Sequence, residues 1–299
     1  MIYRIGNLAV DSGCGIVAVA VGSLPGFACF ESVISPGEPV LIHLRSGNGD
    51  LTVEKVVEWL PLKQPIYHIT ADDAEISLFR RSEGRFLLKI DCEGDALLMS
   101  CGPEMQEVEF AGALTPRMLK YALWVAYGMR ALAEGRVAVH ASAVVADGRA
   151  SLFLGESGTG KSTHTRLWTE HVAGATLLND DSPIVACEGD SVVAYGSPWS
   201  GKTHCYRAES FPLASFTRLH QAPENRIERL GIARGFAALH PSMPPFFCYD
   251  DFLSGRLAEI ESGILSRVPV FGMGSLPDAG AARMSFSVVS GNQCGLNQL

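Results

Sequence analysis

The 299-residue sequence has no CxxC pair and no group of Cys and His residues at the spacing of zinc ligands. Zinc ribbons and zinc fingers need such spacings, so the sequence favours structural cysteines over a zinc site. The eight cysteines are scattered along the chain and no secretory signal precedes them, so we expect them to be reduced and structural. They stand at positions 14, 29, 92, 101, 187, 205, 248 and 294.

The chain also has little positive charge and no long hydrophobic run. It carries 24 Lys and Arg against 32 Asp and Glu, a net charge of -8, which argues against a general nucleic-acid or anionic-membrane binder. The two most apolar stretches, 15–22 and 121–129, are too short to span a bilayer, and the first has poor flanks for a signal peptide. A cytoplasmic protein is expected.

The sequence does have enough apolar residues to bury a sizeable hydrophobic core, since 47% of its residues are hydrophobic and 19% are charged. Up to residue 112 it alternates short apolar segments with turns such as SGNGD and CEGD, which predicts a β-rich N-terminal subdomain. Residues 114–136 predict a buried helix with Thr115 as N-cap and Pro116 in its first turn. Residues 113–299 then form the second predicted domain. The expected N-terminal strands are GIVAVAV, PVLIHL, PIYHIT, AEISLFR and RFLLKI.

Residues 155–162, GESGTGKS, match the pattern G-x-x-x-x-G-K-[ST] without a mismatch. Glycines let backbone N–H groups approach phosphate oxygens, and a following helix directs its positive end toward them. In such a loop Lys161 reaches the β- and γ-phosphates and the Ser162 hydroxyl is a ligand for Mg²⁺. The predicted nucleotide-binding residues are Gly155, Glu156, Ser157, Gly158, Thr159, Gly160, Lys161, Ser162 and Thr163.

A pair of carboxylates follows this loop closely. Asp180 and Asp181 come 19 and 20 residues after Lys161, which leaves room for one helix and one strand, ATLLN. If that strand lies parallel to and beside ASLFL (150–154), both carboxylates end up at the phosphate side of the sheet. One would then hold Mg²⁺ and the other accept a proton, the two roles that phosphoryl transfer needs.

The stretch HASAVVADGRASLFLGESGTGKST with LLNDDSPIV resembles the catalytic core of HPr kinase/phosphorylase, a core shared more distantly with ATP-dependent phosphoenolpyruvate carboxykinases. The likeness spans about 112–285 and is closest to HPr-kinase-like proteins of peptide-modification gene clusters. It implies an α/β fold, α+β overall, with this P-loop core. It also implies Asp180 as general base, Asp181 with Ser162 on the metal side, and His140 near the base. The family's glycine- and arginine-containing substrate loop has no clear match.

A second glycine- and serine-rich loop, YGSPWSGKTHCYR (195–207), carries two cations. Lys202 is a candidate catalytic residue that stabilises the transferring charge. Ser197, Trp199 and Arg207 are candidates for contact with the substrate, although each also suits a structural role in a loop. The downstream segment NRIERLGIARG is expected to be an amphipathic helix with a solvated side.

These features favour a Mg-ATP-dependent kinase that phosphorylates a hydroxyl, expected to be a serine of a protein or peptide. Two alternatives remain at this point: a carboxykinase-like phosphotransferase acting on a small molecule, and a non-catalytic nucleotide-binding scaffold. ATP and Mg²⁺ are the expected cofactors. The expected partner is a phosphate acceptor, either a protein or peptide with a hydroxyl or a small molecule, while nucleic acid and membrane are not expected. Whether the chain forms a homo-oligomer is left open by the sequence.

Overall fold

The structure is a computed structural model that describes residues 1–47, 51–52, 64–71, 73–81, 83–201 and 203–294. The chain forms two compact units, Met1–Glu134 with Pro245–Arg256 and Gly135–Pro244 with Leu257–Leu299. Helix α3, which the sequence analysis groups with the second domain, belongs to the first unit. The expected domain boundary after residue 112 stays a prediction. No helix within the described ranges is long and apolar enough to cross a membrane.

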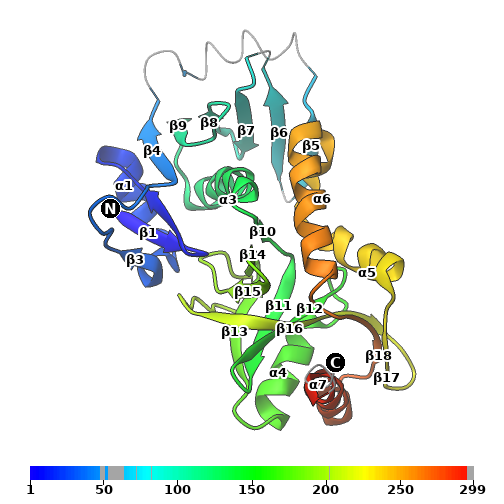
Figure 1. The fold of residues 1–299 in the computed structure, drawn as a ribbon. Coiled ribbons are helices and arrows are strands. Elements are labelled where there is room, and N and C mark those ends of the chain that lie inside the picture. The colour runs from blue at the N-terminus through cyan, green and yellow to red at the C-terminus, as the bar shows by residue number, and fades with distance from the viewer. Residues whose placement is uncertain (48–50, 53–63, 72, 82, 202, 295–299) are drawn as a thin grey trace. The chain divides into compact units, whose positions relative to one another are not determined.

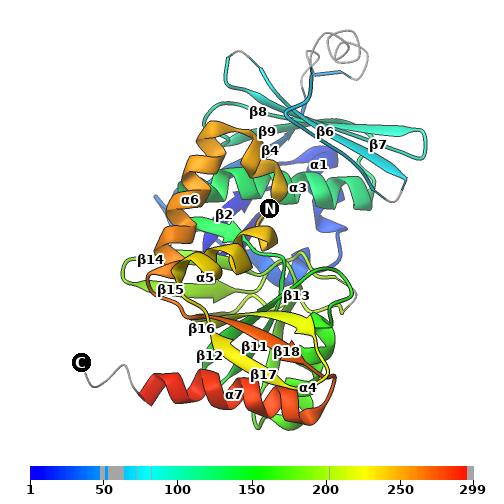
Figure 2. The same ribbon diagram turned by 90° about the vertical axis from the view of Figure 1, so that its right-hand side faces the viewer.

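The first unit contains a sheet of nine strands among the described residues, in the order β3-β1-β2-β4-β9-β8-β7-β6-β5. Strands β5 to β9 form an antiparallel meander, which Figure 2 shows edge-on. The strands are β1 (Ile2–Ile5), β2 (Leu8–Asp11), β3 (Glu31–Ser32), β4 (Ile42–Ser46), β5 (Tyr67–Ala71), β6 (Ala74–Arg80), β7 (Phe86–Cys92), β8 (Asp95–Cys101) and β9 (Glu107–Gly112).

The prediction of a strand at GIVAVAV was wrong, because residues Gly15–Gly22 form helix α1. A short apolar run fits a strand and a buried helix equally well, and its environment decides. Here Val17 and Val21, four residues apart, are buried, whereas Val19 between them is exposed. That is helical spacing, not alternation. The other four N-terminal strand predictions coincide with β4, β5, β6 and β7.

The predicted helix over 114–136 is confirmed as α3 (Pro116–Ala133). Pro116 opens it as expected, but the Thr115 side chain makes no capping hydrogen bond. Trp124 packs edge-on against Phe246 of a short 3-10 turn, Pro245–Tyr249, and the Tyr127 hydroxyl donates to the Ile5 carbonyl at 3.0 Å. The aromatic residues of α3 therefore serve the core of the first unit.

The second unit is built on a mixed sheet (Figure 1). Its order is β10-β14-β15-β16-β12-β11-β13, and β18 pairs with both β16 and β17. Strands β12, β16 and β18 are parallel neighbours. The strands are β10 (Arg136–Ala138), β11 (Ala141–Ala146), β12 (Arg149–Leu154), β13 (Thr176–Asp181), β14 (Ile184–Glu188), β15 (Ser191–Tyr195), β16 (Ser210–Gln221), β17 (Arg226–Arg229) and β18 (Val270–Ser275).

The sheet order corrects one expectation about β13. It does not pair with β12, because β11 lies between them and pairs antiparallel with both. Two antiparallel steps still leave β13 parallel to β12, so both strands end at the same edge of the sheet. The loop after β12 and the acid pair at the end of β13 consequently meet there.

The part of the chain after residue 200 adds the strands β16, β17 and β18 to this sheet. The 12-residue strand β16 and the strand β18 lie next to β12, and Arg226–Arg229 is a strand instead of the start of an amphipathic helix. The helices of this part are α5 (Ile232–Leu239), α6 (Asp251–Leu265) and α7 (Ala279–Cys294).

Helix α4 (Lys161–His171) is held against the sheet by an aromatic core that it shares with α7. Trp168 packs edge-on against Phe153 of β12 and Phe286 of α7, and its indole N–H donates to the Ser285 hydroxyl at 2.8 Å. Both ribbon views show α4 and α7 lying side by side (Figures 1 and 2). The start of α4 is therefore fixed relative to the edge of the sheet.

Candidate active site

The predicted phosphate loop lies between a strand and a helix, as its pattern requires. Strand β12 ends at Leu154 and helix α4 begins at Lys161. Gly155 and Gly160 adopt φ angles of 152° and 108°, which side chains with a Cβ rarely tolerate. Gly160 is the N-cap of α4, so the free N–H groups of the first helical turn open into the loop. The loop thus presents backbone donors suited to an anion.

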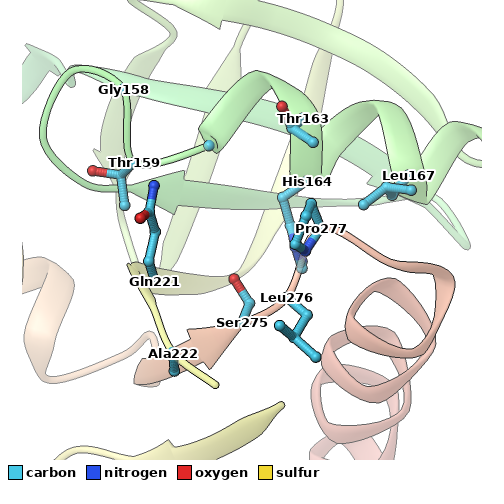
Figure 3. A pocket seen from close by; sticks show the side chains of 11 residues that line it. Gly158, Thr159, Thr163, His164, Leu167, Gln221, Ala222, Ser275, Leu276 and Pro277 are labelled. Atoms are coloured by element: carbon cyan, nitrogen blue, oxygen red, sulfur yellow. The ribbon is translucent and has the colours of Figure 1, made fainter. Parts of the chain in front are cut away.

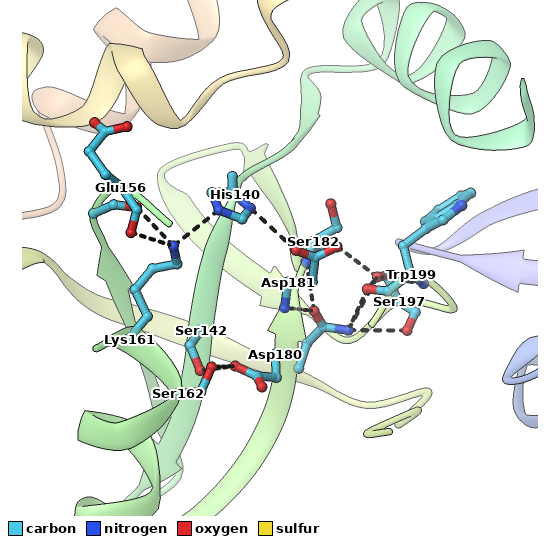
Figure 4. A network of polar contacts seen from close by, with 12 residues as sticks. His140, Ser142, Glu156, Lys161, Ser162, Asp180, Asp181, Ser182, Ser197 and Trp199 are labelled. Atoms are coloured by element: carbon cyan, nitrogen blue, oxygen red, sulfur yellow. Dashed lines mark hydrogen bonds and ion pairs between the residues drawn. The ribbon is translucent and has the colours of Figure 1, made fainter. Parts of the chain in front are cut away.

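Lys161, the first residue of α4, directs its ammonium into this loop, where it contacts three acceptors (Figure 4). They are the carbonyl oxygens of Gly155 and Glu156, at 2.8 and 3.4 Å, and His140 Nε2 at 3.0 Å. Partial burial lowers the pKa of Lys161 below its ordinary value, and the nearby carboxylate of Asp181 opposes that shift. An anion in the loop would take the place of these three acceptors.

Asp180 lies on the Ser162 side of the site. Its Oδ1 accepts from the hydroxyls of Ser162 and Ser142, at 2.9 and 2.7 Å. Ser142 is the residue of β11 directly opposite Asp180 in the strand register. The carboxylate is only 6% exposed, and its Oδ2 has no hydrogen-bond partner within the described residues. A buried carboxylate oxygen without a donor is costly unless a ligand completes it.

Asp181 points to the other side and contacts His140. Its Oδ1 lies 3.3 Å from His140 Nδ1, and both side chains are about half exposed, 40% and 49%. An ammonium can only donate, so His140 Nε2 is placed to accept from Lys161 while Nδ1 faces Asp181. His140 stands in the break between β10 and β11, where its N–H donates to the Ser242 carbonyl. The stretch VAVHASAVVA (137–146), whose apolar residues predict one strand, therefore covers the end of β10 and the whole of β11.

Asn179, which the sequence analysis did not single out, holds the end of β13 in place. Its fully buried amide donates to the Ser197 and Trp199 carbonyl oxygens, each at 3.2 Å, while its Oδ1 accepts from the N–H groups of Asp181 and Ser182. The residue ties the acid pair to the loop after β15. The sequence offered one signal for this role: Asn179 is a polar residue that directly precedes the two aspartates, after the apolar residues of the same strand.

Residues 196–201 support the end of β13 through backbone carbonyl groups and the Ser197 hydroxyl. Ser197 is fully buried and donates to the Ser182 carbonyl at 2.6 Å, and Trp199 is 4% exposed. Arg207 donates to Leu177 and Thr176 at the opposite end of β13 from the aspartates. Lys202 lies outside the described residues. The candidate substrate contacts Ser197, Trp199 and Arg207 remain predictions, and the structure gives these three residues framework contacts.

A second missed interaction involves Glu156 of the loop. Arg218, near the end of β16, places its guanidinium 2.5 Å from the Glu156 carboxylate and also donates to the Ala238 carbonyl. Arg218 stands opposite Leu154 in the register of β16 with β12. The isolated arginine in an apolar strand, ASFTRL, was the signal available in the sequence.

The residues at this edge fit a metal that is also held by phosphate. Among the described residues no group of three or more His, Cys, Asp and Glu side chains is placed to hold a metal. Mg²⁺ with a nucleotide is bound by one or two protein oxygens, phosphate oxygens and water. The Ser162 hydroxyl and the unpaired Oδ2 of Asp180 supply such protein oxygens.

Comparisons with known proteins add little to this geometry. No protein-family model matches the sequence. No curated protein matches it either. Among solved structures, the HPr(Ser) kinase/phosphatase from Coxiella burnetii is similar over 54% of this chain and 98% of that chain, with 13% identity and a TM-score of 0.32. A TM-score of 0.32 is too low to establish a shared fold. The resemblance to HPr kinase therefore remains a prediction, and the site stands on its own contacts.

Proposed function

We propose that the protein transfers the γ-phosphate of Mg-ATP to a hydroxyl group, expected to be a serine of a protein or peptide. The observation that carries the proposal is the buried, unpaired carboxylate oxygen of Asp180 beside the Ser162 hydroxyl. It lies at the N-terminus of the helix that follows the glycine loop. Phosphoryl transfer is catalysed mostly by positioning and by neutralising charge, and these groups are suited to both.

The phosphates would lie against the loop 155–160 and the first turn of α4. Lys161 would leave the carbonyl oxygens of Gly155 and Glu156 and contact the β- and γ-phosphates instead. Partial burial of its ammonium strengthens the attraction, because a charge in a poorly solvated site is weakly screened.

Ser162 and Asp180 would hold Mg²⁺ together with the phosphate oxygens. This division of roles differs from the sequence-based expectation, in which Asp181 is on the metal side and Asp180 is the base. The contacts of Asp180 with Ser162, and of Asp181 with His140, support the exchange of roles. Bound Mg²⁺ would supply neutralisation of the negative charge on the phosphates.

His140 and Asp181 would accept the proton of the attacking hydroxyl. Once Lys161 contacts phosphate, His140 Nε2 loses its donor and becomes a free acceptor, while Asp181 keeps Nδ1–H oriented. The acceptor O–H bond breaks as its proton moves to Nε2. A bond forms from the acceptor oxygen to Pγ, and the bond from Pγ to the β–γ bridging oxygen breaks, releasing ADP.

The test is transfer from γ-labelled ATP with Mg²⁺ to proteins of an extract from the protein's own source. We expect a labelled phosphoserine species with the wild type. With Asp181→Asn we expect at least about 10²-fold less label at unchanged ATP affinity, the typical loss of a general base or its partner. With Asp180→Asn we expect the Mg²⁺ concentration needed for half-maximal nucleotide binding to rise at least about tenfold.

Three outcomes would overturn the proposal. Full transfer by Asp181→Asn would rule out the His140–Asp181 pair as the acceptor of the proton. Tight ATP binding with no phosphate lost to any acceptor would favour the nucleotide-binding scaffold. Nucleotide-dependent decarboxylation of oxaloacetate, assayed in parallel, would favour a carboxykinase-like enzyme.

A further inference from the structure

A cavity of about 440 Å³ opens beside the glycine loop on the side of α7 (Figure 3). Its walls come from the loop and α4, from the end of β16 and from the segment between β18 and α7. Its volume is in the range of small-molecule sites, roughly 300–1,000 Å³. The lining residues are Gly158, Thr159, Gly160, Thr163, His164, Leu167, Gln221, Ala222, Ser275, Leu276 and Pro277.

The cavity and the acid pair lie on different faces of α4. Thr163, His164 and Leu167 line the cavity, and their spacing of one and four residues places them on one side of the helix. Ser162 and Thr165, spaced by three, contact Asp180 and Ser142 on another side. We call these the cavity face and the acid face of α4. A triphosphate laid over the helix N-terminus has one end at each face.

The order of the phosphates, ribose and base along a nucleotide then determines which of them lies in the cavity. In the proposed function the γ-phosphate lies near Lys161, Asp180 and His140. The α-phosphate lies further along the loop and carries the ribose and the base. The nucleoside must leave the loop on the side away from the acid pair, and the cavity begins there, at Gly158, Gly160 and Thr163.

The lining suits a flat aromatic ring with polar edges. Leu167, Leu276 and Pro277 supply apolar surface, and the Gln221 side chain supplies an amide with donor and acceptor groups. Figure 3 shows this amide directed toward Thr159 and the glycine loop. A glutamine amide pairs in a bidentate manner with the edge of a base.

The cavity is also held open by its own framework. Asn225, four residues after Gln221, accepts from the Leu276 N–H at 2.7 Å and donates to the Asp278 carboxylate at 2.9 Å. Asp278 in turn accepts from the Ala281 N–H in the first turn of α7. The two loops that form the outer wall are thus fixed to each other, which preorganises the pocket.

We propose that this cavity holds the base and ribose of the nucleotide, and that the Gln221 amide pairs with the edge of the base. The proposal rests on the proposed function, since the phosphate loop must hold the triphosphate first. On this proposal, the residues that distinguish one nucleoside from another lie at the end of β16 and in the segment before α7. Both segments are distant in sequence from the glycine loop.

The experiment compares ATP, GTP and inorganic tripolyphosphate, each with Mg²⁺, by titration calorimetry. The wild type is expected to bind ATP at least about tenfold more tightly than tripolyphosphate, about 1.4 kcal/mol for the nucleoside. Ala222→Phe fills the cavity and should remove that difference while tripolyphosphate binding stays unchanged. Gln221→Glu offers two acceptors and no donor, which suits the N1–H and N2–H of guanine, so its preference for GTP over ATP should rise about tenfold.

Thr169→Ala is the matched control, because Thr169 lies on the same helix but lines a separate pocket of about 340 Å³ on the acid face. It should leave all three affinities unchanged. If tripolyphosphate binds as tightly as ATP and Ala222→Phe and Gln221→Glu have no effect, the base site is refuted while the phosphate site stands. If neither ATP nor tripolyphosphate binds, the proposed function itself fails.

Discussion

The two faces of helix α4 differ in chemistry although they share one N-terminus. The acid face carries two hydroxyls. Ser162 donates to the Asp180 carboxylate, and Thr165 contacts the Ser142 hydroxyl, which itself donates to Asp180. The cavity face carries a buried histidine and a leucine beside open volume. If the proposed function holds, changes on the acid face should alter phosphate transfer, and changes on the cavity face should alter nucleotide affinity or stability. Four predictions test that separation.

The largest effect is expected where both faces meet, at Lys161. Lys161→Met removes the charge that would contact the β- and γ-phosphates, and we expect the rate of γ-phosphate transfer to fall about 10³-fold. Nucleotide affinity should fall with it, because the same charge acts in the ground state. Labelled-ATP transfer and calorimetry measure the two quantities. A variant with wild-type transfer would show that the loop does not cradle phosphate.

A smaller effect is expected at Gly201, which packs directly on the acid pair. A Cβ at this position would lie 2.8 Å from the Asp180 carbonyl oxygen and 3.4 Å from Asp181 Cβ. Gly201→Ala should displace the end of β13 by a fraction of an ångström and lower transfer about 10²-fold, with ATP affinity retained. Gly231→Ala, where a Cβ meets no atom within 4 Å, is the control and should transfer normally. Equal losses in both variants would contradict the prediction.

On the cavity face, acid should destabilise the protein through His164. Burial lowers the pKa of His164 from its ordinary 6.5 to about 4, so the unfolded chain binds the proton more readily than the folded one. The stabilisation is present above pH 6.5 and is lost as the pH falls toward 4. Between pH 7 and 5 the free energy of unfolding should drop by about 2 kcal/mol from this group alone.

Urea unfolding at the two pH values measures this loss, with His164→Gln as the comparison. Glutamine can still bond to Ser285, the present partner of His164 Nε2, but it does not titrate. The difference between pH 7 and 5 should therefore shrink by about the same 2 kcal/mol in the variant. An unchanged pH dependence would mean that His164 is not the responsible group.

The smallest effect is expected lower on the acid face, at Arg166. This exposed side chain pairs with Glu170 one turn later, at 2.6 Å. Such surface pairs contribute about 0.3–0.5 kcal/mol, so Arg166→Gln should lower stability only slightly and leave transfer unchanged. Thermal unfolding and the transfer assay measure both. A large loss of transfer would extend the active part of the acid face beyond the first turn of α4.

Local patterns in the sequence predicted the centre of the second unit well. The glycine loop lies between a strand and a helix, and the acid pair ends a strand at the same edge of the sheet, as the short spacing required. Spacing did not reveal that β11 inserts between β12 and β13, because strand order depends on contacts between distant segments. Nor did it distinguish Asp180 from Asp181, since adjacent residues of a strand point to opposite faces and only the packing decides which meets Ser162.

Longer-range features escaped the sequence for the same reason. Gln221 and Leu276 are 55 residues apart, and only the parallel pairing of β16 with β18 brings them to one cavity. Residues 15–22 show that a local pattern can also be ambiguous. This apolar run has no polar residues to reveal its periodicity, and it forms a helix where a strand was predicted. Composition could suggest that the segment is apolar, but not which secondary structure it adopts.

The amide of Asn179 has a consequence for the charge at the end of β13. It holds the acid pair in place through neutral hydrogen bonds, without spending a lysine or arginine on the framework. The supports of the acid pair at Asn179 are thus uncharged, and none of them contacts Oδ2 of Asp180. If the proposed function holds, a divalent ion that arrives with its nucleotide would find the Asp180 carboxylate already in place, and its binding would supply the partner that Oδ2 lacks.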